Sequence, residues 1–161
     1  MATHIHEPEL HMYDVDGHTL TEVATHISGM AEAGRAEWFP HMDYEYDGGV
    51  VTAATVTIRL RKTMPRWHGY THASEPVKAE WDRFWHALDA HEGGHFELVM
   101  CHLGSVHAQL VAQSVADAQR VFDEAVQALN DASAGYDSQT NHGLAQGTNI
   151  DVSVENQESV R

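Results

Sequence analysis

The spacing of apolar residues predicts the helices of this chain of 161 residues. Apolar side chains recur every three or four residues in 20–33, 74–113 and 115–133, which is the spacing of an amphipathic helix. Thr19 is a suitable N-cap for the first of these helices and Ser74 for the second. The pattern therefore predicts one short and two long helices.

A different pattern, with apolar and polar residues in alternation, predicts β-strands. The candidate strand 50–61 alternates from Ala54 to Arg61, as in a strand with one buried face, and 37–46 are rich in aromatic residues. The turn Asp47-Gly48-Gly49 between them predicts a hairpin. Met12–Val15 is a shorter candidate strand, and 63–73 is predicted to be a loop.

These elements predict one α+β domain over residues 12–145, with a small antiparallel sheet packed on two long helices. Residues 1–11 are polar and carry three histidines, so we expect a flexible arm there. Residues 146–161 contain almost no large apolar side chains, and we expect a disordered tail.

Composition excludes several classes of partner. The net charge of −15 argues against nucleic acid and against anionic membrane surfaces. No apolar run is long enough to cross a membrane, and the single Cys101 rules out an internal disulfide. The chain starts without a signal sequence, which predicts a cytoplasmic protein, or a secreted one if a leader was removed. The oligomeric state stays undetermined.

Candidate chemistry centres on His91-Glu92-Gly93-Gly94-His95, within the long predicted helix. Histidines four residues apart project from the same side of a helix and can bind one zinc ion. Glu92 between them is placed to accept a proton from water. Because the chain has 14 histidines, chance alone produces this pattern in about one of ten such compositions. The residues around the motif therefore have to show whether it is a metal site.

The setting favours a metal site. His91 and His95 continue the apolar stripe that contains Trp81, Phe84 and Leu88, which places both rings on the core-facing side. Buried polar groups need partners, and hydrogen-bonded core histidines are the alternative. The paired glycines each cost a helix about 1 kcal/mol, which predicts close approach by another backbone or by substrate.

A catalytic zinc site has three protein ligands, so one more ligand is needed. His102 lies two helical turns from His95, about 10 Å along the axis, and is too far away. The segment 135–143 follows the last predicted helix, and a helical hairpin would return it towards the motif. We therefore expect the third ligand from this segment.

Several motifs resemble the bacterial family of predicted secreted zinc-dependent proteases (domain of unknown function 922). The similarity covers roughly residues 10–145 and rests on five motifs: Tyr13-Asp14-Val15, Met64-Pro65-Arg66-Trp67, Trp81-Asp82-Arg83-Phe84, the histidine motif itself, and the closing Tyr136-Asp137-x-x-Thr140-x-His142-Gly143. The closing motif is the more specific, because many zincins share the central one.

The resemblance implies a zincin-type metallohydrolase. It implies zinc at His91 and His95, Glu92 as general base, and His142 as third ligand, with Asp137 as runner-up. The expected reaction is hydrolysis of a peptide or small amide by zinc-activated water. Tyr136 either donates a hydrogen bond to the oxyanion or packs at a helix end.

Two alternatives stay open. The first is a zinc-dependent enzyme that acts on a metabolite, such as a cyclase, lyase or small-amide hydrolase, in an aromatic cleft formed by Trp38, Trp67, Tyr70 and Trp85. The second is a metal-binding module without catalysis, which would leave no coordination position open.

Overall fold

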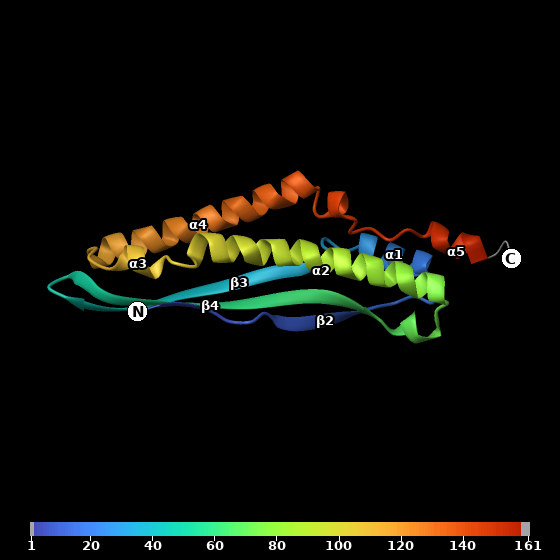
Figure 1. The fold of residues 1–161 in the computed structure, drawn as a ribbon, viewed down its shortest axis with the longest axis horizontal. Coiled ribbons are helices and arrows are strands. Elements are labelled where there is room, and N and C mark those ends of the chain that lie inside the picture. The colour runs from blue at the N-terminus through green and yellow to red at the C-terminus, as the bar shows by residue number, and fades with distance from the viewer. Residues whose placement is uncertain (1, 159–161) are drawn as a thin grey trace.

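The structure, a computed structural model, describes residues 2–158. Within this range a four-stranded sheet is accompanied by helices, and the long helices α2 and α4 lie on the same side of the sheet (Figure 1). The elements, in chain order, are β1 (Ala2–Ile5), β2 (Glu9–Val15), α1 (Leu20–Ser28), β3 (Arg35–Asp47), β4 (Val50–Trp67), the 3₁₀ helix η1 (His68–His72), α2 (Glu75–Leu103), α3 (His107–Leu110), α4 (Val115–Thr140), the 3₁₀ helix η2 (Leu144–Gln146) and α5 (Ser153–Glu158).

The sheet is built around the long strand β4. β3 pairs with it in antiparallel direction, and β1 and β2 pair with it in parallel direction. The sheet is therefore mixed, and the prediction of an antiparallel sheet was wrong outside the hairpin. The physical reason is connectivity: α1 and β3 lie between β2 and β4 in the chain, so β2 can run alongside β4 in the same direction.

The predicted flexible arm is part of this sheet. Ala2–Ile5 pairs with Thr55–Ile58, and Glu9–Val15 pairs with Arg61–Trp67. The two strands follow each other along one side of β4, and Pro8, which has no N–H to donate, lies between them. The arm prediction was wrong because exposed strand pairing orders a polar segment that has little apolar surface of its own.

The hairpin prediction is confirmed, although both strands are longer than expected. Gly48 and Gly49 have φ of 55° and 79°, which lets β3 turn directly into β4. Val56, Ile58 and Leu60 are buried, as the alternation predicts. β4 continues to Trp67, so the first part of the predicted loop 63–73 is strand and the rest is mainly η1.

The helices match the prediction in place but not in length. Thr19 caps α1 by accepting a hydrogen bond from the Glu22 amide at 3.2 Å. α2 ends before Gly104, and a turn separates it from α3, so the predicted helix over 74–113 is interrupted. α4 instead continues past residue 133 to Thr140, which places Tyr136 and Asp137 inside a helix.

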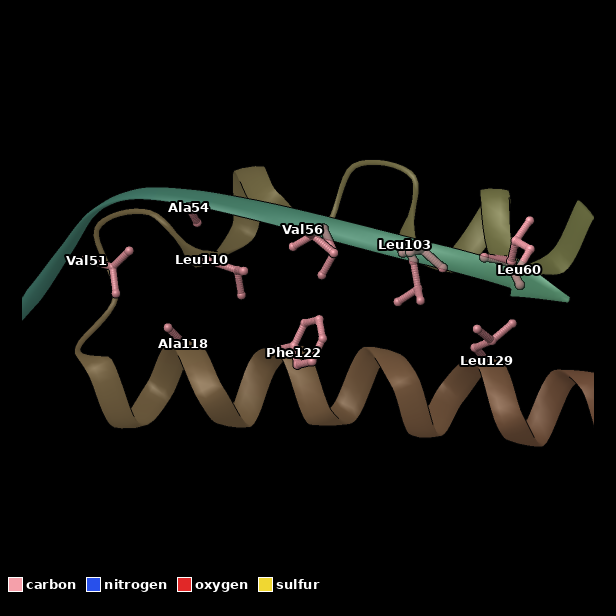
Figure 2. Close-up of a cluster of buried hydrophobic side chains, with 12 residues drawn as sticks. Val51, Ala54, Val56, Leu60, Leu103, Leu110, Ala118, Phe122 and Leu129 are labelled. Atoms are coloured by element: carbon pink, nitrogen blue, oxygen red, sulfur yellow. The ribbon is translucent and has the colours of Figure 1, made fainter. Parts of the chain in front are cut away.

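The core consists of two clusters of buried apolar side chains. The first cluster lies between β4, α3 and α4 and includes Val56, Leu110, Phe122 and Leu129 (Figure 2). The second cluster includes residues of β2, α1, the end of β4 and the first half of α2, such as Val15, Leu20, Met64, Phe84 and Leu88. Helix α2 contributes to both clusters, so its middle lies where they meet.

The predicted disordered tail is ordered through residue 158. Ile150, Val152 and Val154 pack against the second cluster, and the Glu155 carboxylate accepts hydrogen bonds from the Leu20 amide and the Thr21 hydroxyl. The prediction was therefore wrong for residues 146–158, and residues 159–161 lie outside the described range. Among the helices of residues 2–158, none has the length and apolar character to span a bilayer.

Candidate metal centre

The histidine motif lies in the middle of α2, at the junction of the two clusters. His91, Glu92 and His95 are only 4%, 4% and 6% exposed. One ligand atom from each of the three lies within 4.8 Å of the others. The prediction that both imidazoles lie on the core-facing side of the helix is confirmed.

Helix α4 brings Asp137 to the same point. Its Oδ1 lies 3.2 Å from His91 Nε2 and 3.0 Å from His95 Nε2. Two ligand atoms at zinc-bond length and at tetrahedral angles stand about 3.3 Å apart. The distance from the Asp137 oxygen to each of the two ring nitrogens is therefore close to that between two ligands of one tetrahedral ion.

The other ring nitrogens are held by hydrogen bonds. His95 Nδ1 lies 2.7 Å from Ser133 Oγ, and His91 Nδ1 lies 2.8 Å from Gln146 Oε1. An amide oxygen only accepts, so His91 donates from Nδ1, and in the neutral ring Nε2 presents its lone pair towards Asp137. A lone pair facing a carboxylate oxygen at this distance is favourable when a cation lies between them, so these residues fit a metal ion.

The charge states support the same conclusion. Burial lowers the pKa of His95, which favours the neutral ring that binds metals. Burial also raises the pKa of Glu92 from 4.5 to about 8, and the nearby carboxylates of Asp137 and Glu32 act in the same direction. A buried carboxyl group whose pKa is raised by neighbouring carboxylates is stabilised in its charged form by a bound cation.

Glu92 is kept close to the chain that precedes β3. A Cβ on Gly34 would lie 3.0 Å from Glu92 Oε1 and 3.1 Å from Leu88 Cγ. Within residues 2–158, no side chain donates a hydrogen bond to the Glu92 carboxylate. The group is therefore available to a water molecule or a ligand.

Gly94 admits the side chain of Tyr136. A Cβ on Gly94 would lie 2.5 Å from Tyr136 Cζ and closer still to the hydroxyl oxygen, whereas a Cβ on Gly93 would meet nothing within 4 Å. The prediction of a close approach holds for Gly94, but the neighbour is a tyrosine rather than backbone or substrate. Tyr136 stacks on the His91 ring with centroids 5.0 Å apart.

The Tyr136 hydroxyl is already engaged, and it donates to the His91 carbonyl at 3.1 Å. The residue is not among those that line the pocket described below. This position corresponds to the packing alternative for Tyr136 and leaves the oxyanion role without support.

His142 stands apart from the other predicted ligands. It follows the end of α4 with φ of 53°, and its side chain is exposed. It lines the pocket wall instead. Of the two candidates for third ligand, the structure brings Asp137 to the histidines.

A pocket of about 650 Å³ opens over the site. Its walls come from 27–37, from the middle of α2, from Ser133 and Asp137, and from 142–150. The expected aromatic cleft is absent from these walls. Trp67 packs on Trp81, with centroids 5.6 Å apart, and Trp85 donates a hydrogen bond to the Pro65 carbonyl.

Sequence reasoning missed Ser133, Gln146 and the connection around Gly34. Ser133 lies four residues before Asp137, so both fall on one face once α4 is known to continue past 133. Gln146 carried no signal, because it lies in the segment that was expected to be disordered.

Comparison with known proteins identifies a family. A model of the family described as "Bacterial protein of unknown function (DUF922)" matches residues 10–143. No curated protein matches the chain. No solved structure matches it either.

Proposed function

This chain belongs to the DUF922 family of bacterial proteins of unknown function, and on that premise and the geometry of the site we propose that it is a zinc-dependent hydrolase of the zincin type that cleaves peptide or small amide bonds. One observation carries the proposal. Two buried imidazoles present Nε2 to the same Asp137 oxygen, beside a buried carboxylate at a pocket.

Each residue has a distinct role in this proposal. His91, His95 and Asp137 hold the ion, which when bound activates water and polarises a carbonyl. Glu92 accepts the proton of the attacking water on its carboxylate and delivers it to the leaving amine. Burial raises the pKa of Glu92 to about 8 in the metal-free protein, and the charge of a bound cation would lower this pKa towards neutral pH, where a general base works best.

The test compares Glu92→Gln with the wild-type protein. We expect the variant to keep one zinc per chain, measured by elemental analysis, and to lose hydrolysis of a mixed peptide library by about 10²-fold or more. Glu97→Gln is the matched control, because Glu97 is exposed on the same helix and we expect it to change neither quantity. Full hydrolysis by Glu92→Gln would overturn the proposal.

The pocket supports a second candidate, a hydrolase of small amides rather than of proteins. A volume of about 650 Å³ falls within the range of about 300–1,000 Å³ that small-molecule sites occupy. Mass spectrometry after incubation with folded proteins, short peptides and acylated small amines separates the two. Turnover that is confined to the last class would favour the second candidate.

One observation supports a third candidate, a binding module without catalysis. A carboxylate oxygen of Glu92 lies within 4.8 Å of a ligand atom of each histidine, so Glu92 itself is a possible ligand. If Glu92 binds the ion as a fourth protein ligand, no coordination position stays open. In that case Glu92→Gln would lower zinc affinity. If the variant binds zinc as tightly as wild type but no longer hydrolyses the substrate, the result favours the enzyme.

A further inference from the structure

Gln146 contacts the site from outside the part of the chain that matches the family, which ends at residue 143. It is the last residue of η2, and its side chain reaches both the His91 ring and the Tyr136 hydroxyl. Its side chain therefore joins two residues of the matched region.

The hydrogen bonds around Gln146 have a definite direction. The single proton of the Tyr136 hydroxyl goes to the His91 carbonyl at 3.1 Å, which is nearer than Gln146 Oε1 at 3.4 Å. The hydroxyl oxygen then accepts from Gln146 Nε2 at 3.1 Å, so Oε1 turns to His91 Nδ1. This chain of bonds fixes the His91 tautomer that leaves Nε2 free.

Ser133 cannot do the same for His95. A hydroxyl both donates and accepts, so its contact with His95 Nδ1 fits either tautomer. The hydrogen-bond partner of His91 therefore fixes the tautomer of that ring, whereas the partner of His95 does not. His91 is the ring whose orientation depends on the carboxyl-terminal segment.

Several contacts hold that segment over His91. A Cβ on Gly143 would lie 3.0 Å from His91 Cγ, so the chain passes directly against the ring. Farther along, Arg83 donates to the carbonyls of Gly147 and Asn149 at 3.0 and 2.6 Å. Glu80, which is buried and paired with Arg83, accepts from the Asp151 amide at 2.8 Å.

We infer that Gln146 is a positioning residue that orients His91 for metal binding, and that the Glu80–Arg83 pair holds its segment in place. The inference rests on the proposed function, because it requires His91 to be a ligand. Groups that orient a ligand imidazole typically change metal affinity 10–100-fold when they are removed.

The experiment measures zinc affinity by competition with a chelator, on full-length protein. We expect Gln146→Ala to bind about 10–100-fold more weakly than wild type. Gln146→Glu keeps an acceptor for His91 Nδ1 and is expected to restore affinity. Gln139→Ala is the matched control, because Gln139 is exposed on α4, and we expect it to bind as wild type does.

A spectroscopic signature separates orientation from general loosening. In the zinc-loaded protein the His91 Nδ1–H should exchange slowly with water by NMR, and it should exchange fast in Gln146→Ala. Melting of the metal-free variants reports on folding, and Gln146→Met, of similar length, replaces the alanine variant if that one unfolds. Arg83→Met should weaken zinc binding in the same direction.

The outcomes distinguish this inference from the proposed function. If wild type binds no zinc, the proposed function fails and the inference fails with it. If wild type binds zinc and Gln146→Ala binds it equally well, only the inference fails. Loss of affinity in Gln146→Glu as large as in Gln146→Ala would also overturn it, because the acceptor would then be irrelevant.

Discussion

At the scale of single residues, Glu92 is the group on which the chemistry depends. It is buried, it faces a second carboxylate, and it receives no hydrogen bond from any side chain of residues 2–158. Such a group is destabilising when it is charged, unless a cation or a proton compensates. This is the arrangement expected of a proton acceptor that works beside a metal ion.

The burial of Glu92 predicts how the stability of the metal-free protein depends on pH. Its pKa rises from 4.5 in the unfolded chain to about 8 in the fold, so its contribution to stability is complete below pH 4.5 and is lost as the pH rises through 8. The loss is at most about 5 kcal/mol. We expect Glu92→Gln to unfold at higher urea concentration than wild type at pH 8, and to differ less at pH 5. If the variant and wild type differed by the same urea concentration at both pH values, ionisation of Glu92 would not destabilise the fold, and the prediction would be wrong.

At the scale of elements, α2 is an amphipathic helix whose buried face is polar at its centre. Its buried face runs from Val77 to Leu88 in the second cluster and from Val99 to Leu103 in the first cluster. His91, Glu92 and His95 occupy the interval between the clusters. The polar groups are thus fixed by packing on both sides, which limits the motion of the rings.

The two glycines of this helix provide a matched pair of substitutions. Alanine in place of Gly93 meets no neighbour and should raise the free energy of unfolding by about 0.5–1 kcal/mol, from helix propensity alone. Alanine in place of Gly94 must displace the Tyr136 ring from His91, so we expect lower stability by about 1–3 kcal/mol and weaker zinc binding. Urea unfolding measures the stability of both variants, and chelator competition measures their zinc binding. A stabilising Gly94→Ala would contradict the described contact.

At the scale of the whole molecule, the site connects elements that are distant in the chain. Its proposed ligands come from α2 and α4, and its pocket is completed by the connection before β3 and by the segment after α4. A metal ion at this point would cross-link the two long helices. Metal binding should therefore stabilise the whole fold.

Zinc should raise the melting temperature of the metal-free protein. A ligand at 1,000 times its dissociation constant adds about 4 kcal/mol, and for a chain of this size that corresponds to a shift of about 10 °C. The shift should vanish in His91→Ala and on addition of a chelator. It should persist in His86→Ala, because His86 is exposed on the same helix. A shift of equal size in both variants would place zinc elsewhere.

The position of the helices and of the hairpin followed from local patterns. The stripe on α2, the cap at Thr19 and the turn at Gly48-Gly49 each reflect interactions within a few residues, which local sequence specifies. The predicted strand Met12–Val15 is the end of β2, but β1 and the first part of β2 did not follow, because their partner β4 lies about fifty residues away and none of their residues is buried. Strand pairing of this kind depends on tertiary context.

The sequence by itself determined that His91 and His95 share a buried face with Glu92 between them, because helical periodicity fixes that relation. Only the tertiary structure decided which group meets them. Asp137 and Ser133 reach the rings because α4 continues to Thr140, and Gln146 reaches His91 because Arg83 and Glu80 hold the segment after α4. Contacts between distant segments depend on packing and chain direction, which no local pattern encodes.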